Sequence, residues 1–150
     1  METILPIGRV GHTACYYKDH NAVYIFGGQQ ERSGNANMNL RDMQNDLWRF
    51  SLSSGNASKI YVQNLSQLSR RMFMCSFIVS QFFFNIGGVS ASGEIIPEIV
   101  MIDLEKNVCK PITKETNKTM RLLKPLSSMS CVGAFYSSRY SSDGIELDLD

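Results

Sequence analysis

The amino-acid sequence predicts an all-β protein built from a repeated unit. The first observation is a short run, Ala22–Phe26, that is rich in β-branched and aromatic residues and ends at Gly27-Gly28, which is typical of a buried strand. The second is that the same order recurs sixty residues later, where Phe82–Ile86 runs into Gly87-Gly88. Self-similarity at a fixed period indicates units that bury their hydrophobic faces by stacking on one another.

The first unit, residues 1–65, contains four expected strands. Two of them form a hairpin across the polar break at 18–21, and a long polar loop follows at 29–44 because that segment has neither helical nor strand periodicity. Alternating apolar residues then predict a third strand, and a turn at 53–56 leads into a weaker fourth strand. The expected strands are 9–17, 22–26, 45–52 and 59–64.

The second unit, residues 66–113, repeats this order with a shorter loop at 89–98. On the third strand of each unit, equivalent apolar positions alternate: Trp48, Phe50 and Leu52 in the first, and Val100, Ile102 and Leu104 in the second. The remaining segment, 114–150, is expected to be a connector and a partial, divergent third unit that ends on an alternating acidic strand at 145–150. The expected strands of the second unit are 72–79, 82–86, 99–104 and 108–112.

The repeat also predicts which residues form the core. We expect the following among the buried residues: Val23, Ile25, Trp48, Phe50, Phe83, Val100 and Ile102. The four cysteines include no CxxC pair, so they are expected to be small core residues in a reducing compartment. Cys15 and Cys75 keep the sixty-residue spacing and fall, with Cys131, on equivalent strands, as a shared core position would produce.

Charge and hydropathy exclude several classes of partner. With 15 basic and 14 acidic residues, the formal net charge of +1 provides no field that would attract nucleic acid or an anionic membrane. The apolar stretch 72–89 is interrupted by polar residues, and two strands explain it better than a membrane span. Ile4–Ile7 is too short for the apolar centre of a signal peptide. We therefore expect a cytoplasmic or nuclear protein.

The order of strand, strand, Gly-Gly, loop, Asp-Leu-Trp strand, turn and strand resembles one blade of a Kelch-repeat β-propeller. In the first unit, the likeness is carried by Arg9, Gly11, His12, Gly27-Gly28 and Asn45–Phe50. In the second unit, it is carried by Arg71, Gly87-Gly88 and Ile102–Leu104, although Ile102 replaces the aromatic residue of the family pattern and the following tryptophan is absent. The structural motif residues that the resemblance implies are His12, Gly27, Gly28, Asp46, Trp48, Gly87, Gly88 and Asp103.

Propellers close with about four to eight four-stranded blades, whereas this sequence holds two units and a partial third. The expected fold is therefore an incomplete or partner-completed Kelch-type propeller of four-stranded antiparallel blades. Three arrangements stay open: a piece of a longer protein, blades supplied by other chains, or an open stack covered by a partner. In each of them an isolated monomer is not expected, because apolar faces would be left unpaired.

The resemblance favours a non-catalytic protein–protein interaction module or scaffold that recognises a partner through its blade-face loops. Arginine side chains suit the recognition of carboxylates or phosphates. The candidate binding residues are Arg9, Arg32, Asn37, Arg41, Asp42, Arg71, Ser90 and Ser92.

Two other functions are kept as alternatives. One is a structural subunit that completes a larger complex. The other is a fragment of a propeller enzyme, because some Kelch-like propellers are copper oxidases with tyrosine, histidine and cysteine ligands. His12 and His20 are too few for such a site, and no nucleophile or phosphate-loop motif occurs, so we expect no catalytic residue, metal or cofactor.

Overall fold

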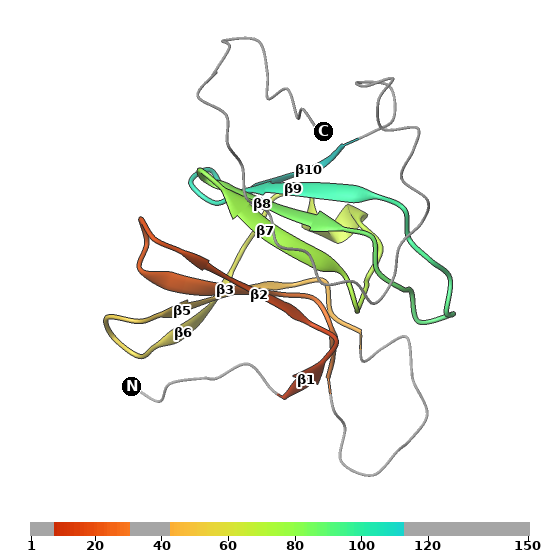
Figure 1. The fold of residues 1–150 in the computed structure, drawn as a ribbon, viewed down its shortest axis with the longest axis horizontal. Coiled ribbons are helices and arrows are strands. Elements are labelled where there is room, and N and C mark those ends of the chain that lie inside the picture. Colours follow the sequence, from red (N-terminus) through yellow and green to blue (C-terminus); the bar gives the residue numbers. More distant parts are fainter. Residues whose placement is uncertain (1–7, 31–42, 113–150) are drawn as a thin grey trace, which may run out of the picture.

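The computed structural model of the chain describes residues 8–30 and 43–112, and within these ranges the protein is all β, without an α-helix (Figure 1). Its strands form three antiparallel sheets, one of two strands and two of four strands. One 3-10 turn, η2 (Leu65–Gln67), lies in the connection between the four-stranded sheets. The strands are β1 (Arg9–Val10), β2 (Thr13–Tyr17), β3 (Ala22–Phe26), β4 (Gln29–Gln30), β5 (Leu47–Ser51), β6 (Ala57–Ile60), β7 (Cys75–Val79), β8 (Phe82–Ile86), β9 (Ile99–Asp103) and β10 (Val108–Ile112).

The two four-stranded sheets have the same connectivity. The first sheet has the order β2-β3-β5-β6, the second has the order β7-β8-β9-β10, and β1 pairs with β4 in the small sheet. Three backbone hydrogen bonds of the first sheet recur at equivalent places in the second. They are Gly27 N to Asp46 O (3.3 Å) with Gly87 N to Glu98 O (3.3 Å), Gln44 N to Gly28 O (2.8 Å) with Ile96 N to Gly88 O (2.9 Å), and Leu52 N to Asn21 O (3.0 Å) with Leu104 N to Gln81 O (2.9 Å).

Strand boundaries differ from the expected ones in the first sheet. The expected strand 9–17 is divided into β1 and β2, because Gly11 between them has φ of +67°. The fourth strand is Ala57–Ile60 rather than 59–64. The Ser51 amide donates to the Asn56 carbonyl and closes the turn there, so the strand begins directly after it, at Ala57. In the second sheet, β7 begins at Cys75 rather than at Met72. The segments expected as strands at 130–136 and 145–150 lie outside the described residues.

Cys15 and Cys75 do not share a position, which corrects the prediction made from their spacing. The β2–β3 hairpin closes on the Tyr17–Ala22 pair across a four-residue turn, whereas the β7–β8 hairpin closes on Val79–Phe82 across two residues. This difference changes the register, so Cys15 pairs with Tyr24 in the middle of β2 while Cys75 pairs with Ile86 at the start of β7. The Gly-Gly pairs keep the sixty-residue period because they follow the second strand of each hairpin.

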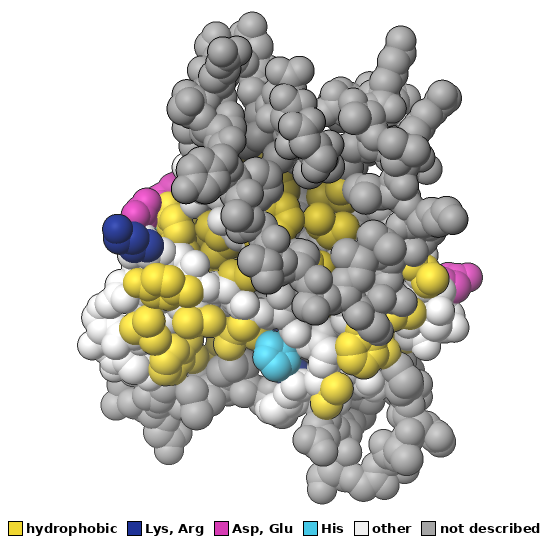
Figure 2. All heavy atoms as spheres, viewed as in Figure 1, with side chains coloured by type: hydrophobic (Ala, Val, Ile, Leu, Met, Phe, Trp, Pro, Cys, Tyr) yellow, Lys and Arg dark blue, Asp and Glu magenta, His cyan; other side chains and the backbone are white. Residues whose placement is uncertain are grey.

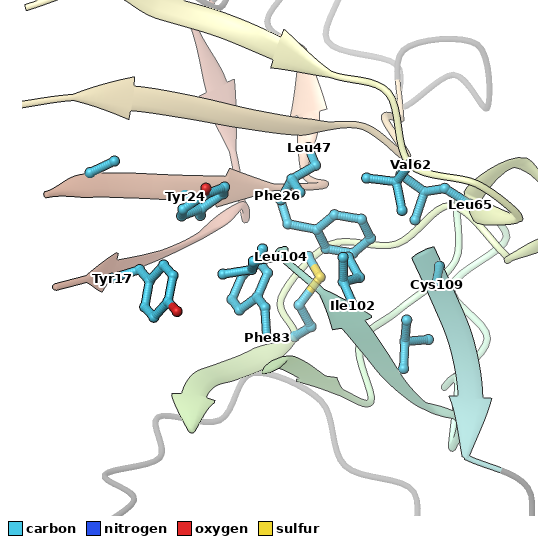
Figure 3. Packing of buried hydrophobic residues seen from close by; sticks show 13 residues of the cluster. Tyr17, Tyr24, Phe26, Leu47, Val62, Leu65, Phe83, Ile102, Leu104 and Cys109 are labelled. Carbon is cyan, nitrogen blue, oxygen red and sulfur yellow. The ribbon is translucent and has the colours of Figure 1, made fainter. Parts of the chain in front are cut away.

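The core lies between one face of each four-stranded sheet (Figure 3). We call the face of the first sheet that carries Cys15, Tyr24 and Phe26 its front face, and the opposite one its back face. The equivalent front face of the second sheet carries Phe77, Phe84 and Ile86, and its back face carries Phe83, Val100 and Ile102. The front face of the first sheet packs on the back face of the second, with Phe26 edge-on to Phe83 at a centroid distance of 6.4 Å.

The core prediction is confirmed in the second sheet and wrong in the first. Phe83, Val100 and Ile102 are buried, as expected. The first-sheet residues of the prediction are only half-buried, because they lie on the back face, which is turned away from the second sheet; these are Val23, Ile25, Trp48 and Phe50. The buried residues of these strands are instead their front-face neighbours, Ala22, Tyr24, Phe26 and Leu47.

Two of the cysteines behave as the sequence indicates. Cys15 and Cys109 carry free thiols, and burial raises the pKa of Cys15 to about 11 and that of Cys109 to about 12. Both thiols therefore stay protonated near neutral pH and are poor nucleophiles. Cys75 is disulfide-bonded, so the expectation of free core thiols is wrong for this residue.

Candidate functional site

The candidate site is the end of the sheets where the Gly-Gly pairs lie. Two connections, called here the first and second loops, begin and end there: one runs from Gly27 to Asp46 and the other from Gly87 to Glu98. Arg9 lies at the base of the first loop with its side chain buried. Its Nη1 donates to the Gly27 carbonyl (2.9 Å) and to Asp46 Oδ1 (2.7 Å), and its Nη2 to Asp46 Oδ2 (3.4 Å). The arginine thus joins the residue that begins the loop to the residue that ends it.

Asp46 is the centre of this cluster. Besides Arg9, it accepts a hydrogen bond from Trp48 Nε1 (2.8 Å), and Lys59 Nζ lies 3.6 Å from its Oδ2. Burial by itself would raise the pKa of the Asp46 carboxyl, but the hydrogen bonds from Arg9 and Trp48 and the two nearby cations together hold it below its ordinary value. Asp46 is therefore ionised at neutral pH, and both of its carboxylate oxygens interact with side chains of the protein.

Arg71 repeats this arrangement in the second sheet. Its side chain is fully buried, and its Nη1 donates to the carbonyls of Gly87 (3.2 Å) and Glu98 (3.0 Å). Its Nη2 also forms an ion pair with the Glu98 carboxylate. Arg9 and Arg71, which the sequence suggested as binding residues, therefore each use their guanidinium to close the base of a loop. Whether they also contact a partner stays a prediction.

The first Gly-Gly pair contacts the start of the second unit. The Gly28 amide donates to the Arg71 carbonyl (3.0 Å), which joins the first sheet to the start of the second unit. A Cβ at Gly28 would lie 2.8 Å from the backbone nitrogen of His12, and its φ of +83° disfavours any other residue. His12 itself is exposed, with Nδ1 3.1 Å from the Arg9 carbonyl oxygen.

The second loop presents polar side chains on a tight turn. The hydroxyls of Ser90 and Ser92 are 2.7 Å apart, and Ser90 Oγ accepts the Glu94 amide (3.1 Å). Ser92 and Glu94 are exposed. Of the candidate binding residues in the first loop, Arg32, Asn37, Arg41 and Asp42 lie outside the described residues. The structure therefore places Arg9, Arg71, Ser90 and Ser92 at one end of the molecule.

Asp103, a motif residue of the second unit, lies at the opposite end. Its Oδ1 accepts the amides of Glu105 and Lys106 (both 3.0 Å), so it shapes the β9–β10 turn rather than the loop end.

A polar cluster lies beside this turn, and it was not predicted from the sequence. His20 Nδ1 lies 2.5 Å from the Tyr24 hydroxyl, and His20 Nε2 lies 3.1 Å from Glu105 Oε1. Tyr17 donates its hydroxyl to the same oxygen (3.2 Å), and burial together with the carboxylates of Glu105 and Asp19 raises the pKa of Tyr17 to about 12. Because Glu105 belongs to the second sheet and the other residues to the first, no local sequence signal could have joined them.

This cluster joins the two sheets. The chain of carboxylate, imidazole and hydroxyl ends on Tyr24, which is buried and whose pKa is raised by that burial. Within residues 8–30 and 43–112, no group of three or more histidine, cysteine or acidic side chains is placed to hold a metal ion. In the same ranges, no helix is long and apolar enough to cross a membrane. No protein-family model matches the chain.

Proposed function

We propose that this chain is a non-catalytic protein–protein interaction module in which the two four-stranded sheets are blades of a Kelch-type β-propeller. The observation that carries the proposal is the repetition of one loop-closing device. In both sheets a buried arginine bonds to the first glycine of the Gly-Gly pair and to the acidic residue before the third strand. A scaffold that holds variable loops by a constant base is suited to recognition, because the loops can change without loss of the fold.

The proposed recognition surface is the Gly-Gly end. Gly28 bonds to the Arg71 carbonyl, and Arg71 bonds in turn to the Gly87 carbonyl, so the bases of both loops are tied to one residue. Ser92 and Glu94 extend from one of these loops into solvent. A cytoplasmic or nuclear protein that offers hydrogen-bond donors to these groups is the kind of partner that this surface fits.

The proposal is tested with a photo-crosslinking amino acid placed at Ser92, and a matched chain that carries it at Ser54. Both positions are exposed, but Ser54 lies in the β5–β6 turn at the other end of the first sheet. We expect a discrete protein adduct from Ser92 in cell extract and none from Ser54. Replacing Ser92 and Glu94 with alanine should then abolish binding of the purified partner. Equal adducts from both positions would contradict recognition through the Gly-Gly end.

A further inference from the structure

The two sheets differ in the exposure of their outer faces, which point away from the core between them. On the back face of the first sheet, Tyr16 is 53% and Leu52 is 49% exposed. On the front face of the second sheet, Phe84 is only 3% and Ile99 only 8% exposed, although neither belongs to the core cluster between the sheets. Neighbouring strands of the same sheet shield only the flanks of a side chain such as Phe84. Other atoms must therefore lie over the front face of the second sheet.

Cys75 lies on the same front face, opposite Ile86, and is disulfide-bonded. The sequence contains four cysteines, of which Cys15 and Cys109 carry free thiols. Within one chain, the cysteine left to bond to Cys75 is Cys131, which lies outside the described residues. The bond therefore identifies the part of the sequence that meets this face.

The path of the chain allows this pairing. Ile112, the last residue of β10, lies in the same cross-strand row as Cys75, because the row runs Cys75–Ile86–Ile99–Ile112 across the four strands. A strand spacing of about 4.8 Å places the two ends of this row roughly 14 Å apart. Nineteen residues lead from 112 to 131 (131 − 112 = 19), and an extended chain covers about 3.3 Å per residue. The connection is thus several times longer than the gap.

The composition around Cys131 suits an apolar face. Residues 130–136 read SCVGAFY and include no charged side chain. On the front face, Phe77 stacks on Phe84 at a centroid distance of 5.2 Å, and Met101 lies on the other side of Phe84. Figure 2, in the view of Figure 1, shows hydrophobic side chains where the second sheet lies. Contact between the segment and this face would remove apolar surface of both from water.

We propose that Cys75 is bonded to Cys131 of the same chain and that the segment 130–136 packs on the front face of the second sheet. The bond holds the segment at one end of the face, and apolar contacts with Phe77 and Phe84 cover its middle. The inference goes beyond the proposed function and rests neither on the Kelch resemblance nor on the loops of the Gly-Gly end. Either proposal can therefore fail without the other.

Peptide mapping of the unreduced chain tests the bond. Free thiols are alkylated in denaturant, and trypsin then places the four cysteines in four different peptides, 10–18, 72–106, 107–114 and 122–139. We expect the monomeric chain to give 72–106 linked to 122–139. Dithiothreitol should separate the two peptides, because it reduces the bond to two thiols and is itself oxidised to a cyclic disulfide.

Two variants control the mapping. Cys131→Ala should abolish the link and leave Cys75 alkylated, whereas Cys15→Ala removes a free thiol and should keep the link. An alkylated Cys75 in the unchanged chain, or a link from 72–106 to any other peptide, would overturn the proposal.

Photo-crosslinking tests the packing independently of the bond. A diazirine amino acid of similar size replaces Met101, which lies beside Phe84 on the front face. The matched chain carries it at Leu52, on the exposed back face of the first sheet. After irradiation and reduction, we expect monomers with an adduct from position 101 to peptide 122–139 and none from position 52. Circular dichroism verifies the fold of both chains. No adduct from position 101, or equal adducts from both positions, would overturn the packing.

Discussion

At the scale of single residues, two kinds of constraint dominate the Gly-Gly end. One is the buried ion pair at the base of each loop, which requires an arginine and an acidic residue far apart in the sequence. The other is the positive φ and close backbone approach at the second glycine of the pair. Neither allows much substitution, and each can be tested by one change.

The Asp46 ion pair should make stability depend on pH. Because the folded-state pKa of Asp46 lies below its ordinary value of 3.8, its contribution is fully present above that value and is lost as the pH falls through the folded-state pKa. We expect Asp46→Asn to cost about 3–5 kcal/mol at pH 7 by leaving the buried Arg9 cation unpaired. Urea unfolding should show this difference shrinking at acid pH. A difference that is independent of pH would contradict the assignment, and Glu94→Gln on the exposed loop is the control.

Gly28→Ala tests the close approach of the Gly28 backbone to His12 within the first unit. The new Cβ would meet the His12 backbone at 2.8 Å, so strain and clash together should cost roughly 2–5 kcal/mol. Gly55 is a matched control, because it also has positive φ (+69°) but nothing lies within 4 Å of a Cβ there. Gly55→Ala should therefore report backbone strain alone. Thermal melts that shift equally for both variants would exclude the clash.

At the scale of elements, each sheet has two apolar faces and its partner determines which one is in the core. Leu52 and Leu104 are both leucines and occupy equivalent positions, Leu52 directly after β5 and Leu104 directly after β9. We expect Leu104→Ala to cost about 2–5 kcal/mol, as buried leucines do, and Leu52→Ala to stay within about 0.5 kcal/mol in dilute solution. Equal costs in dilute solution would mean that the back face of the first sheet is already covered.

At the scale of the whole molecule, the two sheets share one core and should unfold together. Phe26 in the first sheet contacts Phe83 in the second, and the contact of His20 Nε2 with the Glu105 carboxylate joins the sheets at the other end. Phe26→Ala should cost about 3–5 kcal/mol and lower hydrogen-exchange protection in β9 as well as in β3. Loss of protection in β3 alone would show that the sheets are separate cooperative units.

The sequence by itself determined the elements and their repetition. Alternating apolar residues and the Gly-Gly pairs are local signals, so they placed the hairpins and the third strands within a few residues and predicted an all-β chain. They also placed Ser90 and Ser92 on a loop, and the resemblance singled out Arg9 and Arg71, although not their contacts with the Gly-Gly pairs. The Kelch resemblance and partner binding stay predictions.

Only the tertiary structure decided which faces are buried and which charged groups meet. Alternation along Ala22–Phe26 defines two faces equally well, and the position of the second sheet selects Tyr24 over Val23. A two-residue difference between hairpin turns separates Cys15 from Cys75. Arg9 meets Asp46, and His20 meets Glu105, only because strands distant in the sequence become neighbours. Burial and ion pairing depend on which residues of distant strands face one another in the folded protein. A local sequence pattern carries no information about that.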